Sequence, residues 1–590
     1  MNSRLPLWTL VFCRLCFGYE IDPIIYTSKQ SLKESELTSS SVLLTKKQIE
    51  DSSNFNAIDL ISRVPGVFIE QQGTIGGQSN IFIRGADSKH TLILIDGIKV
   101  FDPTSIGGKF ELSILNTLDI ERVEVLKGSQ SVLYGSDAIG GVINIVTSKG
   151  SSKNIIEIGS GILKEFKTTS TKMYDQGTIM FSGFYQESYF DSDVIDTNEK
   201  DYKQSRGLSV AASFDLEAFT FDSTFKLNNT FSQVDQADQN GVPIDGPNAY
   251  QKLNNIFLSN KFSYEIDKLK KVEMVFGGSL SERVNKSESV FEADGEVGEV
   301  EARYIENREN NNLLLGLIYN FESAKTTFND KKSTESIEAY INNHTSYKAV
   351  IFETGVRGLN NKDFGNHLIY SIGLNYKFLK NMKFGITSKN GFKAPSSFEL
   401  YDPVYGNQSL TPEKSNSIEL NLKYSQERIR IEGAIFRNNV ENTIGSDSAF
   451  KSVNIDGYTA SGIDLSTIYE KSDLVLISNI SVIDYSLSDG RKAQKKPYLL
   501  GNLIVDRKFG NSSNLRLNYT YNSKRFEYTN RGRDEQTLNS YSVFDIQYIL
   551  KIKRLKVISQ IRNLFDQKYE TSFGYTTQRR GLQINLQYKY

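Results

Sequence analysis

The feature that most limits how this chain can fold is a two-residue alternation of apolar and polar side chains that extends from residue 151 to residue 590. Residues 418–424 (IELNLKY), 515–521 (LRLNYTY) and 582–590 (LQINLQYKY) are clear examples. Each places its apolar side chains on one face of an extended chain and Glu, Asn, Gln, Arg or Lys on the other. This period predicts β-strands with one apolar and one polar face.

Two architectures accommodate such strands. A soluble β-sandwich would need two sheets whose apolar faces point inward, but the polar face here is rich in Asn, Lys, Glu and Ser. A transmembrane barrel needs apolar side chains toward lipid and polar ones toward the lumen, with aromatic strand ends. No apolar stretch reaches the eighteen residues of a membrane helix, so only a barrel could place this chain in a membrane. At about 20 residues per strand and connection, the region supplies about 22 strands.

Residues 58–147 form a different kind of module. Short Ile- and Val-rich runs separated by glycines predict a small mixed α/β unit. Apolar positions 58, 61 and 64 share a helical face that Pro65 and Gly66 end, and a strand follows at 67–71. Glycine-rich residues 73–79 and 102–109 are expected to form long loops at one end of the module.

The first 19 residues carry Arg4 and then an apolar run, which predicts a cleaved export signal, although Arg14 interrupts the run and no small-residue cleavage site is evident. A short β-prone run follows within polar sequence, and such a run stays mobile unless a partner strand pairs with it. An ordinary flexible lead-in is the alternative. The residues of this run are Asp22, Pro23, Ile24, Ile25, Tyr26, Thr27 and Ser28.

Composition argues against catalysis. The only cysteines are Cys13 and Cys16, and the three histidines lie far apart in the sequence, so neither a thiol nucleophile nor a Cys or His metal centre is expected. The chain has no nucleophile elbow, P-loop or His-Glu-x-x-His motif, which argues against an enzyme and against nucleotide or redox cofactors. The net charge of -1 gives no reason to expect a nucleic-acid partner.

Two acidic clusters stand out in the barrel region. Hard cations such as calcium take six to eight oxygen ligands, which two neighbouring loops could supply together. Solvated acidic loops are the alternative, since neither cluster has EF-hand spacing. The candidate ligands are Asp191, Asp193, Asp196, Asp201, Asp235, Asp238 and Asp245.

The module motifs at 81–85 (IFIRG), 92–97 (LILIDG) and 134–141 (YGSDAIGG) resemble the plug domain of outer-membrane TonB-dependent receptors. Together with 392–395 (FKAP), 412–415 (PEKS) and 563–566 (NLFD), they are similar to the vitamin B12 (cobalamin) receptor branch of that family. The resemblance implies a membrane β fold: an antiparallel transmembrane β-barrel of about 22 strands with an N-terminal mixed α/β plug domain inside the lumen. It implies a signal peptide at 1–19, a periplasmic segment at 20–53, the plug at 54–150 and the barrel at 151–590.

The resemblance also implies roles. Residues 22–28 match the TonB box except that Tyr26 stands at an apolar position. The acidic clusters correspond to the calcium-binding loops of that branch. The expected partners are TonB with its inner-membrane energising complex, cobalamin, and outer-membrane lipid and lipopolysaccharide around a monomer. A ferric-siderophore or haem receptor and a passive porin remain alternatives. The plug apices that would meet the corrinoid are Gly76, Gly77, Gln78, Ser79, Phe101, Asp102, Thr104 and Ser105.

Overall fold

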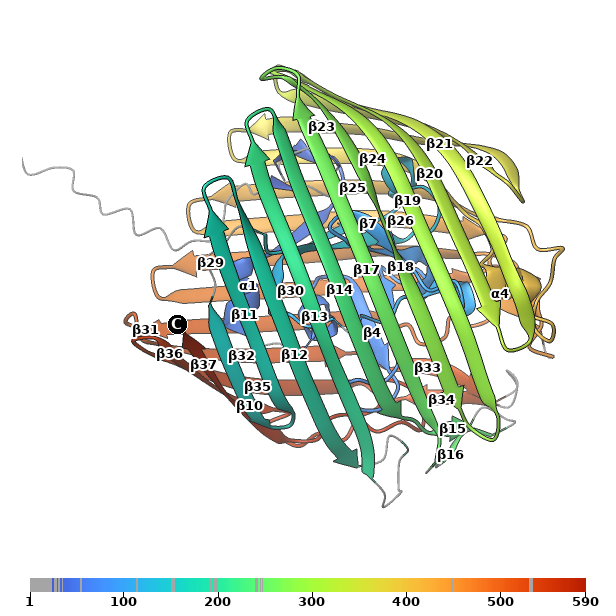
Figure 1. Cartoon of the computed structure of the whole chain (residues 1–590), viewed down its shortest axis with the longest axis vertical. Helices are drawn as coiled ribbons and strands as arrows, with labels where there is room; N and C mark the ends of the chain where they lie inside the picture. The colour runs from blue at the N-terminus through green and yellow to red at the C-terminus, as the bar shows by residue number, and fades with distance from the viewer. Residues whose placement is uncertain are drawn as a thin grey trace, which may run out of the picture.

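The computed structural model shows one large closed barrel with a smaller domain inside it (Figure 1). Every structural statement below concerns the residues that the structure describes, which are 24–25, 29, 32–33, 36–52, 56–112, 115–149, 154–191, 194, 200–238, 242–244, 246, 248–447, 449–529 and 534–590. No helix in these ranges is long and apolar enough to cross a membrane.

The barrel has 22 antiparallel strands, and its last strand pairs with its first to close the sheet, as the alternation predicted. The barrel strands are β10 (Ile155–Gly161), β11 (Lys164–Tyr174), β12 (Gly177–Asp191), β13 (Lys200–Leu216), β14 (Phe219–Gln233), β17 (Tyr250–Glu265), β18 (Lys270–Lys286), β19 (Val290–Arg308), β20 (Asn311–Thr326), β21 (Asn329–Tyr347), β22 (Val350–Asn361), β23 (Gly365–Leu379), β24 (Met382–Lys393), β25 (Glu413–Gln426), β26 (Ile429–Glu441), β29 (Tyr458–Lys471), β30 (Leu474–Leu487), β31 (Leu499–Phe509), β32 (Ser513–Asn522), β35 (Tyr541–Ile552), β36 (Leu555–Arg562) and β37 (Gly581–Lys589).

Side-chain burial in the barrel is the inverse of that in a soluble protein. On β25, Ile418 and Leu422 are 47% and 39% exposed on the outer face, whereas Glu419 and Asn421 are buried toward the lumen. Strand β37 repeats this, with Leu582 outward and Gln583 inward. A closed sheet satisfies all its backbone hydrogen bonds, so an apolar outer face suits lipid. The sandwich alternative is therefore wrong.

The plug lies inside the barrel (Figure 1). Its main sheet has the order β3-β8-β9-β6-β7, in which only the β6–β9 pair is parallel, and β4 pairs with β5 in a separate two-stranded sheet. The expected strand at 67–71 is present as β4. The plug strands and helices are β3 (Ser41–Thr45), α1 (Lys46–Ser52), α2 (Ala57–Ile61), β4 (Val67–Gln71), β5 (Ser79–Ile83), η2 (Ser88–His90), β6 (Thr91–Ile95), β7 (Ile98–Val100), η3 (Ile106–Gly108), β8 (Ile120–Lys127), α3 (Ser131–Tyr134) and β9 (Gly141–Thr147).

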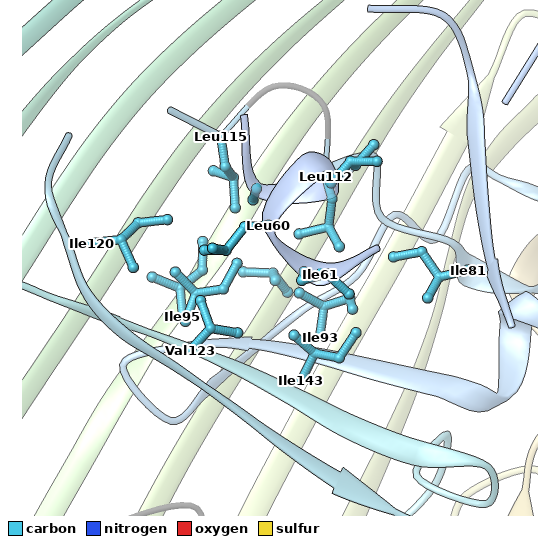
Figure 2. Close-up of a cluster of buried hydrophobic side chains, with 14 of the residues drawn as sticks. Leu60, Ile61, Ile81, Ile93, Ile95, Leu112, Leu115, Ile120, Val123 and Ile143 are labelled. Atoms are coloured by element: carbon cyan, nitrogen blue, oxygen red, sulfur yellow. The ribbon is translucent and has the colours of Figure 1, made fainter. Parts of the chain in front are cut away.

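The plug core packs α2 against the sheet (Figure 2). Asn56 caps α2, since its side-chain oxygen accepts from the Asp59 N–H at 3.1 Å. The predicted helical face holds, because Ile58, Ile61 and Val64 are all at most 4% exposed. The same core continues into the barrel wall through side chains of β17 and β18, which are Leu253, Phe257 and Val275.

The two rims of the barrel differ. One rim carries only short turns, whereas the longest connections all leave the other, which is therefore the extracellular rim. The long connections contain short elements, namely β15 (Gln236–Ala237), β16 (Pro243–Ile244), α4 (Ser397–Tyr401), β27 (Ile444–Ser446), β28 (Ser452–Asn454), β33 (Arg525–Thr529) and β34 (Asp534–Leu538). The longest connections are 234–249, 394–412, 442–457, 488–498, 523–540 and 563–580.

Candidate substrate and energy-coupling sites

The expected energy-coupling segment is only partly within the described residues. Ile24 and Ile25 form strand β1 (Ile24–Ile25), which pairs antiparallel with β2 (Leu32–Lys33). The remaining expected residues of this segment, Asp22, Pro23, Tyr26, Thr27 and Ser28, lie outside the described residues. The backbone of Ile24 and Ile25 is thus paired with another part of the same chain. A partner strand could add to the second edge of β1 or take the place of β2.

Lys29, directly after this segment, is anchored to the barrel wall. Its ammonium donates to both carboxylate oxygens of Glu301, at 2.8 and 3.0 Å, and lies 4.9 and 5.1 Å from the ring centres of Tyr134 and Tyr340. Burial lowers the pKa of Lys29 to about 8, although Glu301 opposes the shift. Cation–π contacts and a buried ion pair therefore fix the chain beside the coupling segment.

The segment at 38–40 is held by β25 and its neighbours. Glu419 accepts from the Ser40 N–H at 2.8 Å and from its hydroxyl at 2.9 Å. The Asn421 amide donates to the Thr38 carbonyl at 2.7 Å, and the Thr38 hydroxyl donates to Glu353. Strand β3 begins one residue later, at Ser41, and pairs with β8 in the five-stranded plug sheet. Residues 41–45, predicted as part of the periplasmic segment at 20–53, therefore lie in the plug sheet.

The first predicted apex, residues 73–79, lies beside the extracellular ends of β13 and β14. The Gly76 carbonyl accepts from Ser232 at 3.4 Å, and Gly77 donates its N–H to Thr74 at 2.9 Å. Ser79 donates its hydroxyl to Glu111 at 2.7 Å and is buried. Gln78 is exposed, so it is the side chain of this apex that a ligand could reach.

The second apex, residues 101–109, is mostly occupied with its own structure. Phe101, Asp102 and Thr104 are at most 6% exposed, and Asp102 accepts from the Thr104 N–H at 2.9 Å and binds Arg283 of β18. Ser105 donates its hydroxyl to the Asp102 carbonyl at 2.9 Å. Ile106, which the sequence reasoning did not single out, is 61% exposed at the tip of this apex.

The two acidic clusters meet in space through Asp235. Its carboxylate accepts from the Val194 N–H at 2.8 Å and from the Gly246 N–H at 3.1 Å, so it joins the β12–β13 loop to the β14–β17 loop. Asp238 accepts from the Val242 N–H at 2.9 Å, and Asp201 is buried on β13. Asp193, Asp196 and Asp245 lie outside the described residues, as does the side chain of Asp191. Among the side chains that the structure describes, no group of three metal-ligating residues occurs.

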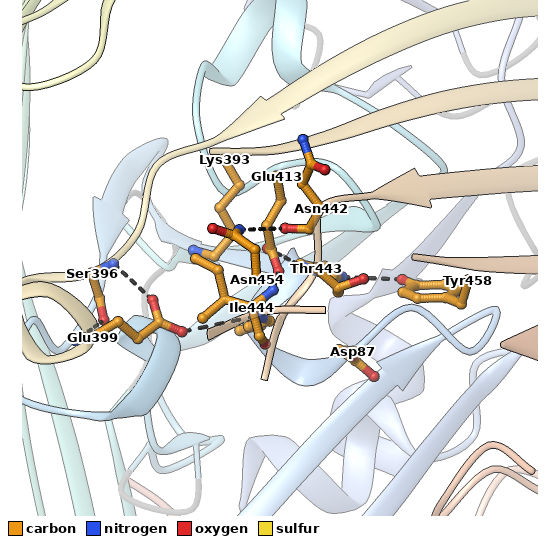
Figure 3. Close-up of polar contacts among 12 residues, drawn as sticks. Asp87, Lys393, Ser396, Glu399, Glu413, Asn442, Thr443, Ile444, Asn454 and Tyr458 are labelled. Carbon is orange, nitrogen blue, oxygen red and sulfur yellow. Dashed lines mark hydrogen bonds and ion pairs between the residues drawn. The ribbon is translucent and has the colours of Figure 1, made fainter. Parts of the chain in front are cut away.

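Sequence reasoning missed a polar cluster where the plug meets three extracellular loops. Lys89 donates to Glu413 and to the Ile444 carbonyl, both at 2.6 Å, and His90 lies 2.7 Å from the second Glu413 oxygen and 3.1 Å from the Tyr458 hydroxyl. Figure 3 labels Glu413, Ile444 and Tyr458 of this cluster. In the sequence this cluster is visible only as two adjacent basic residues before the apolar run at 92–95, and nothing there indicates that they are buried.

The same cluster extends to a third loop. Lys496 of the 488–498 connection pairs with Asp87 at 2.6 Å and lies 4.6 Å from the ring centre of Tyr458. Burial would raise the pKa of Asp87, but Lys496 and then His90 outweigh it and hold the pKa well below its usual range.

Arg84 fastens the plug to the barrel wall. It donates to Glu419 at 2.5 Å and to Asp464 of β29 at 2.8 Å, and it lies 4.4 Å from the ring centre of Phe436. Lys127 adds a 3.2 Å contact to Asp464. Arg122, in contrast, bonds within the plug to Glu124 at 2.7 Å.

A cavity of about 210 Å³ separates the α2–β4 side of the plug from β30–β32 and β35. Asp59 crosses it to Arg562 in a two-pronged ion pair, at 2.7 and 3.1 Å. Burial, followed by the nearby Arg516 and Arg562, lowers the pKa of Arg63 at its wall to about 10. Typical small-molecule pockets are larger, at about 300–1,000 Å³, so the plug leaves no path of substrate size at this cavity.

Comparison with known families agrees with this architecture. Residues 33–142 match the TonB-dependent Receptor Plug Domain, and residues 164–564 match the TonB dependent receptor-like, beta-barrel family. The chain belongs to the TonB-dependent receptor family. Its barrel accordingly lies in the bacterial outer membrane, and TonB and a small nutrient ligand are the partners that the family implies.

Similar proteins divide between two kinds of cargo. Two vitamin B12 transporters named BtuB, from Vibrio vulnificus strains YJ016 and CMCP6, are 27% and 24% identical, over 93% and 94% of this chain and 92% and 93% of their own length. Among solved structures, the ferripyoverdine receptor of Pseudomonas aeruginosa has a TM-score of 0.82 at 14% identity, covering 96% of this chain and 88% of that one. The siderophore receptor PirA of Acinetobacter baumannii has a TM-score of 0.80 at 16% identity, covering 93% and 98%. These structures share the fold.

Proposed function

We propose that this receptor imports cobalamin or a related corrinoid across the outer membrane, driven by TonB. The observation that carries the proposal is the similarity, over more than nine-tenths of the chain, to two proteins named as vitamin B12 transporters. The test is calorimetric titration of the folded, purified receptor with cyanocobalamin. Saturable binding is the expected result, and no heat of binding from folded protein would remove corrinoids as the substrate.

Energy coupling is assigned to residues 22–28. An extended segment can add to the sheet of a partner by strand pairing, and Ile24 and Ile25 are already extended in β1. Deleting residues 22–28 is expected to abolish uptake by cells while purified receptor still binds its ligand. Uptake that continues at the original rate after the deletion would contradict energy coupling through this segment.

Calcium is proposed as the ion that orders the two acidic loops. Asp235 already draws both loops together, and calcium favours several carboxylate oxygens in a flexible loop setting. Chelator is expected to weaken cyanocobalamin binding, and Asp235→Asn is expected to do the same in calcium. Asp489→Asn, in the separate 488–498 loop, is the matched control and should leave the calcium dependence unchanged. Equal binding with calcium and with chelator would exclude the ion.

A ferric siderophore is the second candidate cargo, because the solved structures with the same fold include siderophore receptors. A titration with a ferric siderophore under the same conditions separates the two. Haem has less support, because buried His90 and His344 are already bonded to neighbouring side chains.

The outer face is proposed to contact lipopolysaccharide around a monomer. At the extracellular end, Lys252 and Lys286 both lie over the Tyr250 ring, 5.0 and 5.6 Å from its centre. Outward lysines beside an aromatic belt suit the phosphorylated sugars of an outer-leaflet glycolipid. Replacing both lysines with Gln should reduce the lipopolysaccharide that co-purifies, and unchanged co-purification would contradict this contact.

A further inference from the structure

Strand β25 contacts the N-terminal part of the chain at three positions along its inner face, Glu413, Glu419 and Asn421. Its inward side chains alternate from Glu413 at the extracellular end to Asn421, and eight steps of about 3.3 Å place these two roughly 26 Å apart. Glu413 binds the plug residues Lys89 and His90, and Asn421 binds the Thr38 carbonyl in the segment at 38–40. One inner face therefore connects the extracellular end of the plug with the segment that leads back to the energy-coupling strand.

The extracellular contact also includes an external loop. Ile444, in hairpin β27–β28, donates its N–H to the Glu413 oxygen that also accepts from Lys89, and its carbonyl accepts a second bond from Lys89. Glu413 and Lys89 are 0% and 8% exposed. Because plug, barrel strand and loop share one buried carboxylate, hairpin β27–β28 cannot shift without changing the partners of Lys89.

That hairpin is not isolated on the outer surface. Asn407 donates to the Ser452 carbonyl at 2.9 Å, and Asn454 exchanges bonds with the backbone of Thr411, both at 2.8 Å. The 394–412 and 442–457 loops are therefore joined by direct hydrogen bonds. A ligand that displaced one loop would have to break these bonds or carry the other loop with it.

The lower contact shares a carboxylate in the same way. Glu419 accepts from Arg84 through one oxygen and from Ser40 through the other. Arg84 has a positive φ of 48°, and it begins the short turn that carries Lys89. A non-glycine residue at positive φ is strained, so its surroundings must hold it there. The turn that starts at Arg84 is therefore the covalent link between Lys89 at the extracellular end and the Glu419 carboxylate that holds Ser40.

We propose that Lys89 and Glu413 are positioning residues that couple the 394–412 and 442–457 loops, through the Arg84 turn and Glu419, to release of the segment at 38–40. Residues 38–40 have two states, docked on β25 or released. The Lys89–Glu413 contact at the extracellular end and the Glu419–Ser40 contact both bias the equilibrium between these states. The biological role of this coupling rests on the proposed import function, but the coupling itself can be tested without knowing the cargo.

The test uses the full chain with Cys13 and Cys16 replaced by Ser and with one reporter thiol, Ser39→Cys. Residue 39 is 8% exposed, so maleimide modification reports release of the segment. Lys89→Met is expected to raise the modification rate of unliganded receptor about tenfold, within the 5- to 150-fold range of typical site-to-site coupling. Glu413→Gln, which keeps the shape of the side chain, should raise it as well.

The matched control is Arg562→Met. It breaks a comparable 2.7 Å ion pair between the barrel wall and the plug, with Asp59, on β36 and away from β25. It should leave the rate at residue 39 within about twofold, because distant sites without shared partners act independently. Equal rates for Lys89→Met and Arg562→Met would overturn the coupling. Heat-modifiable gel mobility checks that every variant has a folded barrel.

The same modification experiment with cyanocobalamin present separates this proposal from the proposed function. If cyanocobalamin binds, it should speed modification in the parent protein, and Lys89→Met should remove that response while keeping the affinity. A ligand response that persists in Lys89→Met would contradict the coupling. If cyanocobalamin does not bind any variant, the corrinoid assignment fails, whereas the comparison of unliganded rates still decides the role of Lys89.

Discussion

Removing the Arg84 guanidinium should loosen the attachment of the plug to the barrel wall. Arg84→Met deletes two buried ion pairs, with Glu419 and Asp464, and the contact with the Phe436 ring. Each of the four side chains is at most 6% exposed, so water cannot replace the lost partner. Breaking a buried pair on one side costs about 3–5 kcal/mol, because the remaining charge stays buried.

Two contacts limit the loss. Lys127 remains 3.2 Å from Asp464, and Ser40 still donates to Glu419, so each carboxylate keeps one hydrogen-bond donor. The lower part of the range is therefore expected, about 3 kcal/mol, which corresponds to about a hundredfold faster local opening at 1.36 kcal/mol per power of ten. Arg84→Lys keeps a charge but can reach only one carboxylate, and should fall between the two.

Hydrogen exchange followed by mass spectrometry measures this opening directly. The amides of β8 and β9 should exchange about a hundredfold faster in Arg84→Met, while those of the barrel strands keep their protection. Adding Glu419→Gln to Arg84→Met should cost less than the sum of the single changes, because the two side chains share one contact. Exchange in β8 and β9 that stays within about threefold of the parent protein would refute the reasoning.

Three further perturbations test other parts of the structure. Burial lowers the pKa of Lys29 from 10.5 to about 8, so between these pH values the released segment binds more protons than the docked one. Docking should therefore strengthen as pH rises through this window. A spin label at Ile25→Cys should become less mobile from pH 7.5 to 9.5, and Lys29→Met should remove this pH dependence. Gly108→Ala would put a Cβ 1.6 Å from the Phe101 ring, at a backbone φ of +72°, so the second apex would have to shift and cyanocobalamin affinity should fall sharply. Gly97→Ala is the control, because it has a similar φ of +82° but open space around it, and it should change the affinity little. Phe257→Ala removes a barrel side chain from the plug core and should cost about 3–5 kcal/mol, seen as faster exchange in α2; exchange equal to that of the outward Phe262→Ala control would contradict the packing.

The barrel was predictable because its signal is repeated. A period of two in strands such as β25 and β37 needs no tertiary information, and chain length then sets the number of strands at about 22. Plug strand β4 and the buried face of α2 also followed from local pattern. The partners of Lys89 could not be found in this way, because Glu413 and Ile444 lie more than 320 residues away in the sequence.

The predicted ligand apices illustrate the same limit. Sequence located the loops at 73–79 and 101–109, but not which side chains face outward from them. Asp102 is a polar residue at a loop, and it is buried against Arg283, whereas apolar Ile106 is exposed. Only the register of β18 beside the plug decides this, and no short motif encodes it.

The polar inner wall has a mechanical consequence for the plug. Most of that wall is lined by Asn, Ser, Thr, Glu and similar side chains, which exchange plug partners for water at little net cost. Apolar contacts interrupt this wall at a few places. Leu253, Phe257 and Val275 on β17 and β18 join the plug core, and on other strands Phe436, Ile483 and Leu500 pack against Phe68 and Phe82 of the plug. Separating these contacts exposes apolar surface to water, so the work of displacing the plug is concentrated at these patches rather than spread evenly around the circumference.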